Sequence, residues 1–167
     1  MRADRGGRRP GFSLIEVMTV CVIMGVLSAI SVPRFSRAME QSRANIAVAN
    51  LRAIWTAQRA FWLSPPDGYA PNTFAPDLAT LRSYKLLDGS IQDDPGDGAA
   101  VAAGISYVYK IVQTDPSTFQ ATARRANSTV WTSTLTIDSN GDVTGNVTYV
   151  GSSGYYRNDA PIDQFFQ

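Results

Sequence analysis

The sequence predicts an α+β fold, in which one long N-terminal helix packs on a C-terminal antiparallel sheet of about four strands. Two observations predict it. Apolar residues recur at helical spacing in the first third of the chain, whereas residues 105–150 contain short runs rich in β-branched and aromatic residues, separated by turn residues. Packing the apolar face of the sheet on the helix would bury both elements. With 167 residues, 44% of them apolar, the chain can form one modest core plus one separate element.

The composition argues against several classes of function. A net charge of +1 does not give the whole chain a basic surface for nucleic acid, and the absence of histidine removes the commonest metal ligand and general base. No nucleophile with an adjacent base and no phosphate-binding loop is found, so we expect no enzyme and no cofactor. The one cysteine, Cys21, rules out an intramolecular disulfide, and we expect it to be a buried helical side chain.

Residues 12–33 form the most apolar segment. From Phe12 to Val32 there is no Lys, Arg or Asp, and Glu16 is the only charged residue. As a helix these residues extend roughly 32 Å, the thickness of a bilayer core. The basic residues before them predict a single-pass membrane helix, with the chain after Pro33 extracytoplasmic. These basic residues are Arg2, Arg5, Arg8 and Arg9, against Asp4.

Three ordinary N-terminal signals explain this segment incompletely. A cleaved secretory signal could end at Ala29-Ile30-Ser31, but its apolar core should be shorter and lack a charge. A twin-arginine signal would use Arg8-Arg9, but the Pro10-Gly11 that comes next fits such a signal poorly. A plain signal anchor accounts for the length and the orientation, yet it leaves Glu16 unexplained.

Cleavage after Gly11 would explain the glutamate. Phe12 would become the amino terminus, one helical turn from Glu16. A carboxylate without a partner is strongly disfavoured in a bilayer or a packed core, whereas one paired with an ammonium group is tolerated. We therefore expect Glu16 to pair with the amino terminus of a neighbouring chain.

The stretch GFSLIEVM, residues 11–18, followed by a long apolar helix, resembles the class III signal of type IV pilins and of the pseudopilins of type II secretion. The resemblance covers roughly the first third of the chain. It implies that residues 1–11 are a cytoplasmic leader, that prepilin peptidase cuts after Gly11 and that Phe12 is N-methylated. It also implies that Glu16 serves assembly and that Pro33 kinks the helix. The implied partners are other pilins or pseudopilins in a homo- or hetero-oligomer, prepilin peptidase, and the inner-membrane assembly platform with its ATPase.

Residues 34–63 predict an amphipathic continuation of the helix. Its apolar side contains Ala47, Leu51, Ile54/Trp55 and Phe61/Trp62, and we interpret the aromatic residues as packing residues rather than a ligand cage. Ser64-Pro65-Pro66 ends the helix, because proline lacks the amide donor.

Residues 64–104 are mostly connection. Residues 76–89 predict a short helix that buries Leu78, Leu81 and Leu86 or Leu87 and stops at Gly89. The acidic turn after it contains Asp93, Asp94 and Asp97, which are weak candidates for a calcium site. The proline-tryptophan-glycine signature of the major pseudopilins is missing here, so we predict a solvated loop and no metal.

Residues 105–167 comprise the sheet and a tail. Strands are expected at residues 105–114, 118–126, 130–138 and 142–150. Asp138 to Asp142 superficially resembles an EF-hand loop, but its glycine comes too early and no glutamate closes it, so the Asn-Gly pair predicts a tight hairpin. In the tail, Tyr155, Tyr156, Phe165 and Phe166 must pack on the domain, remain loose or meet a partner.

Two classes of function remain. The first is a structural subunit of a type IV pilus or a type II secretion pseudopilus, located in the inner membrane and then in a filament at the cell surface. The alternative is a membrane-anchored extracytoplasmic binding module that does not form filaments. Within the first class, the sequence does not distinguish the pilus from the pseudopilus.

Overall fold

The computed structural model describes residues 11–96 and 99–150, with the side chains at 30, 32–34 and 114 outside the description. Residues 1–10 of the predicted leader, Asp97 and the aromatic residues of the tail therefore lie outside the described residues. The chain divides into two compact units, residues 1–39 and 40–167, and each is described here by itself.

Helix α1, Leu14–Leu63, begins in the first unit and ends in the second. In the second unit its buried positions follow a spacing of four and three residues, which places them on one face of the helix. These positions are Glu40, Ala44, Ala47, Leu51, Ile54, Gln58 and Phe61, and Ala57 beside Gln58 is buried as well. The helix ends at the predicted residue, immediately before Ser64-Pro65-Pro66.

Helix α2, Leu78–Ser83, is shorter than the sequence predicted. The Asp77 carboxylate caps its start by accepting a hydrogen bond of 2.7 Å from the Thr80 amide. A Schellman motif ends it, since Lys85 has a φ of +59° and the Leu86 amide donates to the Leu81 carbonyl at 3.0 Å. The prediction that this helix runs to Gly89 was wrong, because a lysine supplied the left-handed residue that the sequence analysis assigned to glycine.

The four predicted strands form one antiparallel sheet in the order β1-β2-β3-β4. All strand ends fall within two residues of the prediction. The bounds are β1 Tyr107–Asp115, β2 Thr118–Arg125, β3 Trp131–Asp138 and β4 Val143–Tyr149. The alternation of buried and exposed residues along β2 and β3 gives the sheet one apolar face.

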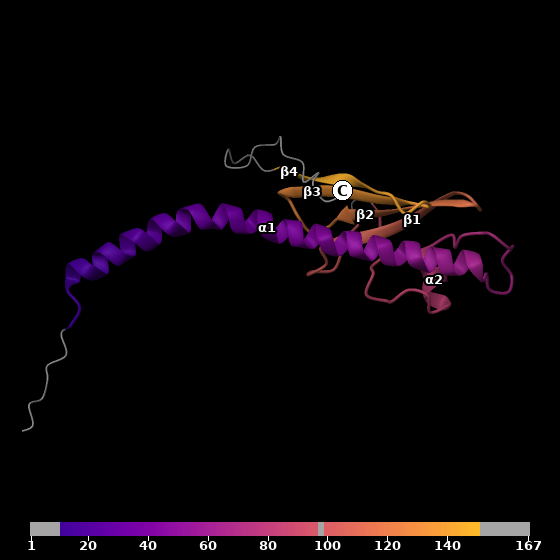
Figure 1. Cartoon of the computed structure of the whole chain (residues 1–167), viewed down its shortest axis with the longest axis horizontal. Helices are drawn as coiled ribbons and strands as arrows, with labels where there is room; N and C mark the ends of the chain where they lie inside the picture. Colours follow the sequence, from indigo (N-terminus) through magenta and orange to yellow (C-terminus); the bar gives the residue numbers. More distant parts are fainter. Residues whose placement is uncertain (1–10, 97–98, 151–167) are drawn as a thin grey trace, which may run out of the picture. The chain divides into compact units, whose positions relative to one another are not determined.

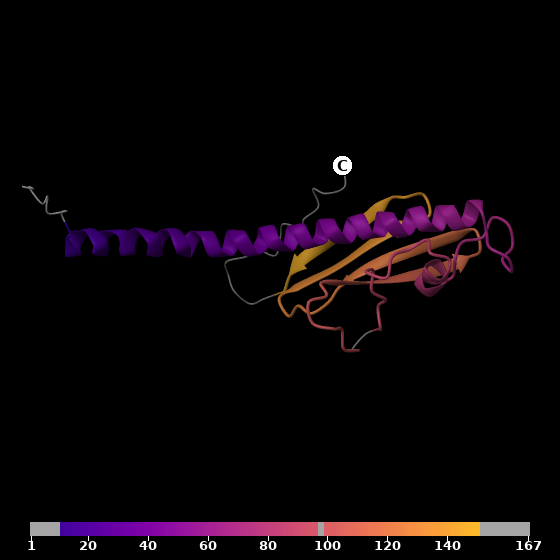
Figure 2. The ribbon, with the colours of Figure 1, turned by 90° about the horizontal axis from the view of Figure 1, so that it is seen from below.

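The second half of α1 lies along that apolar face, and both views show this arrangement (Figures 1 and 2). The core between them combines α1 residues such as Leu51 and Phe61 with the strand residues Phe119, Leu135 and Ile137. Trp55 and Trp62 pack against this core while remaining partly exposed. Their interpretation as packing residues is therefore confirmed.

Three contacts fix α1 to segments distant in sequence. The Trp55 indole donates to the Ser139 carbonyl in the β3–β4 turn at 3.1 Å. The buried Gln58 side chain exchanges two hydrogen bonds with the backbone of Ala75, of 2.9 and 2.8 Å. Asn50 donates to the Tyr109 hydroxyl on β1 at 2.9 Å. Each bond satisfies a polar group at the edge of the core or inside it.

The fourth contact is an ion pair inside the second unit. Glu40 on α1 is fully buried, and Arg125 at the end of β2 binds both of its carboxylate oxygens, at 2.5 and 3.2 Å. Arg43 adds a third bond to Glu40 at 3.0 Å. The Arg125 guanidinium also donates to the carbonyls of Ser106 and Ala126. The buried carboxylate is therefore matched by charge and by geometry.

Gly145 in β4 is expected to tolerate no side chain. Its φ is +124°, and an added Cβ would overlap the Thr134 carbonyl oxygen and lie 2.9 Å from the Leu135 Cα. Gly68 has a φ of +97° with no atom within 4 Å, so Gly68→Ala measures backbone strain alone, about 1–2 kcal/mol. Gly145→Ala should cost clearly more in urea unfolding of the full chain in detergent. Equal losses would contradict the overlap.

Arg125→Met is expected to destabilise the fold by about 3–5 kcal/mol, because it removes the main partner of a buried carboxylate. The double variant Glu40→Met/Arg125→Met should recover part of that loss, since no unpaired charge is then buried. Arg43→Met should cost less than Arg125→Met, because its side chain is 39% exposed. Urea unfolding measures all three, and a double variant less stable than Arg125→Met would contradict the account.

Candidate functional site

The candidate functional site is the start of α1, where the predicted cleavage and assembly residues lie. Gly11, Phe12 and Ser13 precede the helix, and Phe12 is 86% exposed. A Cβ added to Gly11 would meet no atom within 4 Å, and its φ is not in the left-handed region. The described fold therefore does not require glycine at this position.

Glu16 lies in the first turn of α1, three residues after Ser13. Its Oε2 accepts a hydrogen bond of 3.4 Å from the Ser13 amide, while the Glu16 amide donates to the Ser13 carbonyl at 3.0 Å. Sequences of the form S-x-x-E typically make this contact as one half of a capping box. In the single chain the carboxylate thus caps its own helix, a role that the sequence analysis missed although the spacing indicates it.

The described residues that follow in α1, up to position 29, are mostly apolar and exposed. Every position from 11 to 29 is exposed, Cys21 included. The prediction that Cys21 is buried was wrong for the single chain, because no described element covers this part of α1. The Thr19 and Ser31 hydroxyls donate to the carbonyls of Ile15 and Leu27, both at 2.8 Å. These bonds satisfy the polar side chains within the helix itself.

The described part of the chain contains no helix that is both long and apolar enough to cross a membrane. Helix α1 continues past Pro33, whose side chain lies outside the description, so the kink at Pro33 stays a prediction.

Two of the three candidate metal ligands are bound by arginines. Arg82 binds the Asp93 carboxylate at 2.6 Å, and Arg124 binds Asp94 through Nε at 2.8 Å. The backbone of residues 92–94 also pairs with Tyr109 on β1. The Tyr109 amide donates to the Gln92 carbonyl at 2.8 Å, and the Asp94 amide donates to the Tyr109 carbonyl at 2.7 Å. Among the described residues, no group of three acidic or cysteine side chains could hold a metal ion. The acidic turn is thus attached to the β1 edge by its backbone, and to α2 and β2 by the guanidinium groups of Arg82 and Arg124.

The Asp138 carboxylate organises the other acidic turn. Its Oδ1 accepts from the amides of Asn140, Gly141 and Asp142, each at 2.9 Å. Gly141 has a φ of +98°, as the predicted Asn-Gly turn requires. This geometry is that of a tight hairpin turn, which confirms the prediction.

Comparisons with known proteins point to one family. Residues 7–32 match the prokaryotic N-terminal methylation motif. The chain is 37% identical over 91 residues to the type IV major pilin protein PilA of Myxococcus xanthus, covering 52% of this chain and 41% of the relative. It is 38% identical over 50 residues to the type II secretion system core protein G of Pseudomonas aeruginosa, covering 30% and 35% of the two chains.

A fimbrial protein of Pseudomonas aeruginosa is 32% identical over 83 residues, covering 48% of this chain and 53% of the relative. The chain thus spans only about a third to a half of the length of these relatives. No solved structure matches. Over part of its length, the chain is thus similar to a type IV major pilin, to a type II secretion system core protein and to a fimbrial protein, and its N-terminal residues match the methylation motif.

The Asp94–Arg124 pair predicts acid sensitivity of the second unit. The hydrogen bond from Arg124 lowers the pKa of Asp94 below 3.8, against the opposing effect of burial. A carboxyl whose folded pKa is depressed contributes stability above its unfolded pKa and loses it as the pH falls through the folded pKa. Asp94→Asn should therefore destabilise the protein at pH 7, and its difference from wild type should shrink below pH 3.8.

The exposed Asp67 provides the matched control, since Asp67→Asn should change thermal unfolding little at either pH. A calcium chelator is expected to leave the melting temperature at pH 7 unchanged. A marked fall on chelation would instead assign a metal to the acidic turns.

Proposed function

We propose that this chain is a structural subunit of a pilin-type filament, either a type IV pilus or a type II secretion pseudopilus, and not an enzyme. One observation carries the proposal: the N-terminal methylation motif at residues 7–32 coincides with an exposed apolar helix whose only charged residue before Arg34 is Glu16. Homology to type IV pilins and a fimbrial protein supports assembly into pilin-type oligomers.

Processing would occur after Gly11. The described fold places no steric or conformational demand on that glycine, so recognition by a prepilin peptidase is the better reason for its presence. The exposed segment around Phe12 would be accessible to such an enzyme. In this proposal residues 12–33 anchor the subunit in the inner membrane until the assembly platform and its ATPase transfer it into the filament.

Exposed apolar side chains supply the force for assembly. Residues of α1 such as Leu14, Val22 and Leu27 are at least half exposed in the single chain. Lateral packing of several such helices would bury these side chains and place Glu16 in surroundings of low polarity. There a carboxylate requires a cation, and the Phe12 amino group of a neighbouring copy can provide it.

The mature protein is expected to begin at N-methyl-Phe12. Intact-mass and N-terminal peptide analysis of membrane or filament material measures this directly. An amino terminus at Ser31 or Val32, or an uncleaved Met1, would exclude processing as a pilin.

The Glu16 carboxylate is expected to be required for assembly but not for processing. Glu16→Ala should be cut after Gly11 and remain in the membrane, because the apolar segment only becomes more hydrophobic. It should enter sheared filaments poorly, since stranding one member of a buried charge pair costs about 3–5 kcal/mol. Processing is read by mass, and assembly by the yield of sheared filaments.

Glu16→Gln separates the charge from the helix cap, because glutamine also closes a capping box. If charge pairing is required, Glu16→Gln should assemble as poorly as Glu16→Ala. Normal assembly of Glu16→Gln would show that the contact with the Ser13 amide is the important one. Thr19→Ala, one turn further along, is the control expected to assemble normally.

A further inference from the structure

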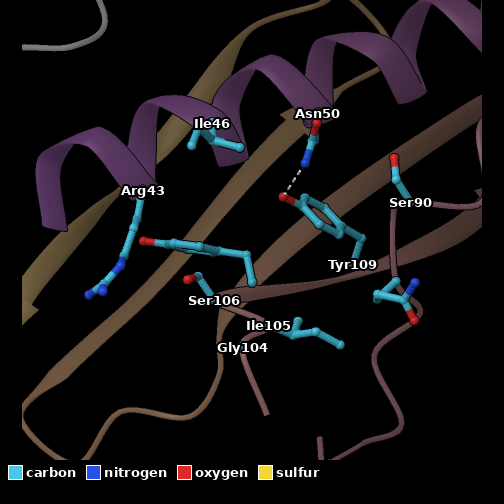
Figure 3. A pocket seen from close by; sticks show the side chains of 10 residues that line it. Arg43, Ile46, Asn50, Ser90, Gly104, Ile105, Ser106 and Tyr109 are labelled. Atoms are coloured by element: carbon cyan, nitrogen blue, oxygen red, sulfur yellow. Dashed lines mark hydrogen bonds between the residues drawn. The ribbon is translucent and has the colours of Figure 1, made fainter. Parts of the chain in front are cut away.

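A recess with polar and apolar lining lies between α1 and the β1 edge of the sheet, wholly within the second unit (Figure 3). Its volume is about 290 Å³, at the lower end of the range of small-molecule sites. Polar side chains line its interior, while Ile46 and Ile105 form an apolar part of its wall. The lining residues are Arg43, Ile46, Asn50, Ser90, Gln92, Gly104, Ile105, Ser106, Tyr107 and Tyr109.

The recess carries a surplus positive charge. Arg43 is the only charged side chain among its lining residues. Arg43 and Arg125 share the one carboxylate of Glu40, so two positive charges face one negative charge and leave a net charge of +1. Arg125 is buried and bidentate on Glu40, whereas Arg43 is 39% exposed and uses only Nη1 for that contact. The remaining Arg43 nitrogens are available to a monoanion.

One tyrosine hydroxyl adds a hydrogen-bond donor to the recess. The Tyr109 hydroxyl accepts a bond from Asn50, which leaves its own proton free to be donated. Tyr107 also lines the recess, but its hydroxyl is buried and offers no donor to a ligand there. Burial raises the pKa of Tyr109, so its hydroxyl remains a protonated donor.

We propose that this recess binds a small hydroxylated monocarboxylate of the size of a single sugar acid. Arg43 would bind the carboxylate, since a single surplus guanidinium matches one negative charge better than a phosphate dianion. The recess is larger than a carboxylate group alone, and the amide oxygen of Asn50 and the hydroxyls of Ser90 and Ser106 suit a ligand bearing hydroxyls. This inference does not depend on filament formation.

The test measures binding to the full chain in detergent micelles, by calorimetry and by chemical-shift changes. D-glucuronate is the probe, glucose is its uncharged counterpart, and acetate is the carboxylate without hydroxyls. Glucuronate is expected to bind, with glucose and acetate at least about tenfold weaker. Arg43→Gln and Tyr109→Phe should each weaken glucuronate binding several-fold, whereas Arg52→Gln, an exposed arginine outside the recess, should not.

Three results would overturn the proposal. Equal affinity for glucuronate and glucose would remove the role of the surplus charge. Binding by folded Tyr109→Phe and Arg43→Gln that equals wild type would place the ligand elsewhere. Glucuronate binding that is lost as the protein concentration rises would show that an acidic side chain of a second copy competes for the recess, and is its occupant. Thermal unfolding monitors the folding of each variant, and Tyr109→Phe keeps the test valid if Arg43→Gln does not fold.

Discussion

A carboxylate buried between a helix and a sheet determines how the second unit is built. Glu40 has no exposed surface, so its charge must be met inside the protein, and Arg125 reaches it from a strand 85 residues further along the chain. A bidentate pair tolerates little sliding or rotation of one element against the other. This geometry sets the rotation of α1, because Glu40 lies in phase with the apolar positions that face the sheet. Gln58 makes an equivalent polar connection further along the same face, to the backbone of Ala75.

Ion pairs between arginine and a carboxylate also hold the segment between α2 and β1 against the sheet. Arg82 of α2 binds Asp93 and Arg124 of β2 binds Asp94, while the backbone at Asp93 pairs with Tyr109 of β1. A segment that looks like an acidic, solvated loop thus protects one edge of the sheet. The recess described above lies between this segment and α1, and both contribute side chains to its lining.

The two units differ in how well each satisfies its own groups. In the second unit, buried charges and amides mostly find partners within the described residues, and the apolar side chains form a core. Among the described residues of the first unit, the large apolar side chains are exposed, and Glu16 accepts a bond of 3.4 Å from a backbone amide of its own chain. The second unit thus has a core of its own, while the described apolar side chains of the first unit are left uncovered in the single chain.

The sequence by itself determined the elements. Hydrophobic periodicity predicted α1 and its end at Leu63, and β-branched runs separated by turn residues predicted the β-strands to within two residues, because these signals are local. The motif at residues 11–18 is local too, and the cleavage that it indicates stays a prediction. The end of α2 was missed, since Lys85 adopts a conformation usually left to glycine. The burial of Glu40 and Gln58 was not predicted, because their partners are 85 and 17 residues away in the chain. Only the tertiary structure decided that Arg125, Arg82 and Arg124 neutralise buried or clustered carboxylates, because those pairings exist only once distant segments are brought together.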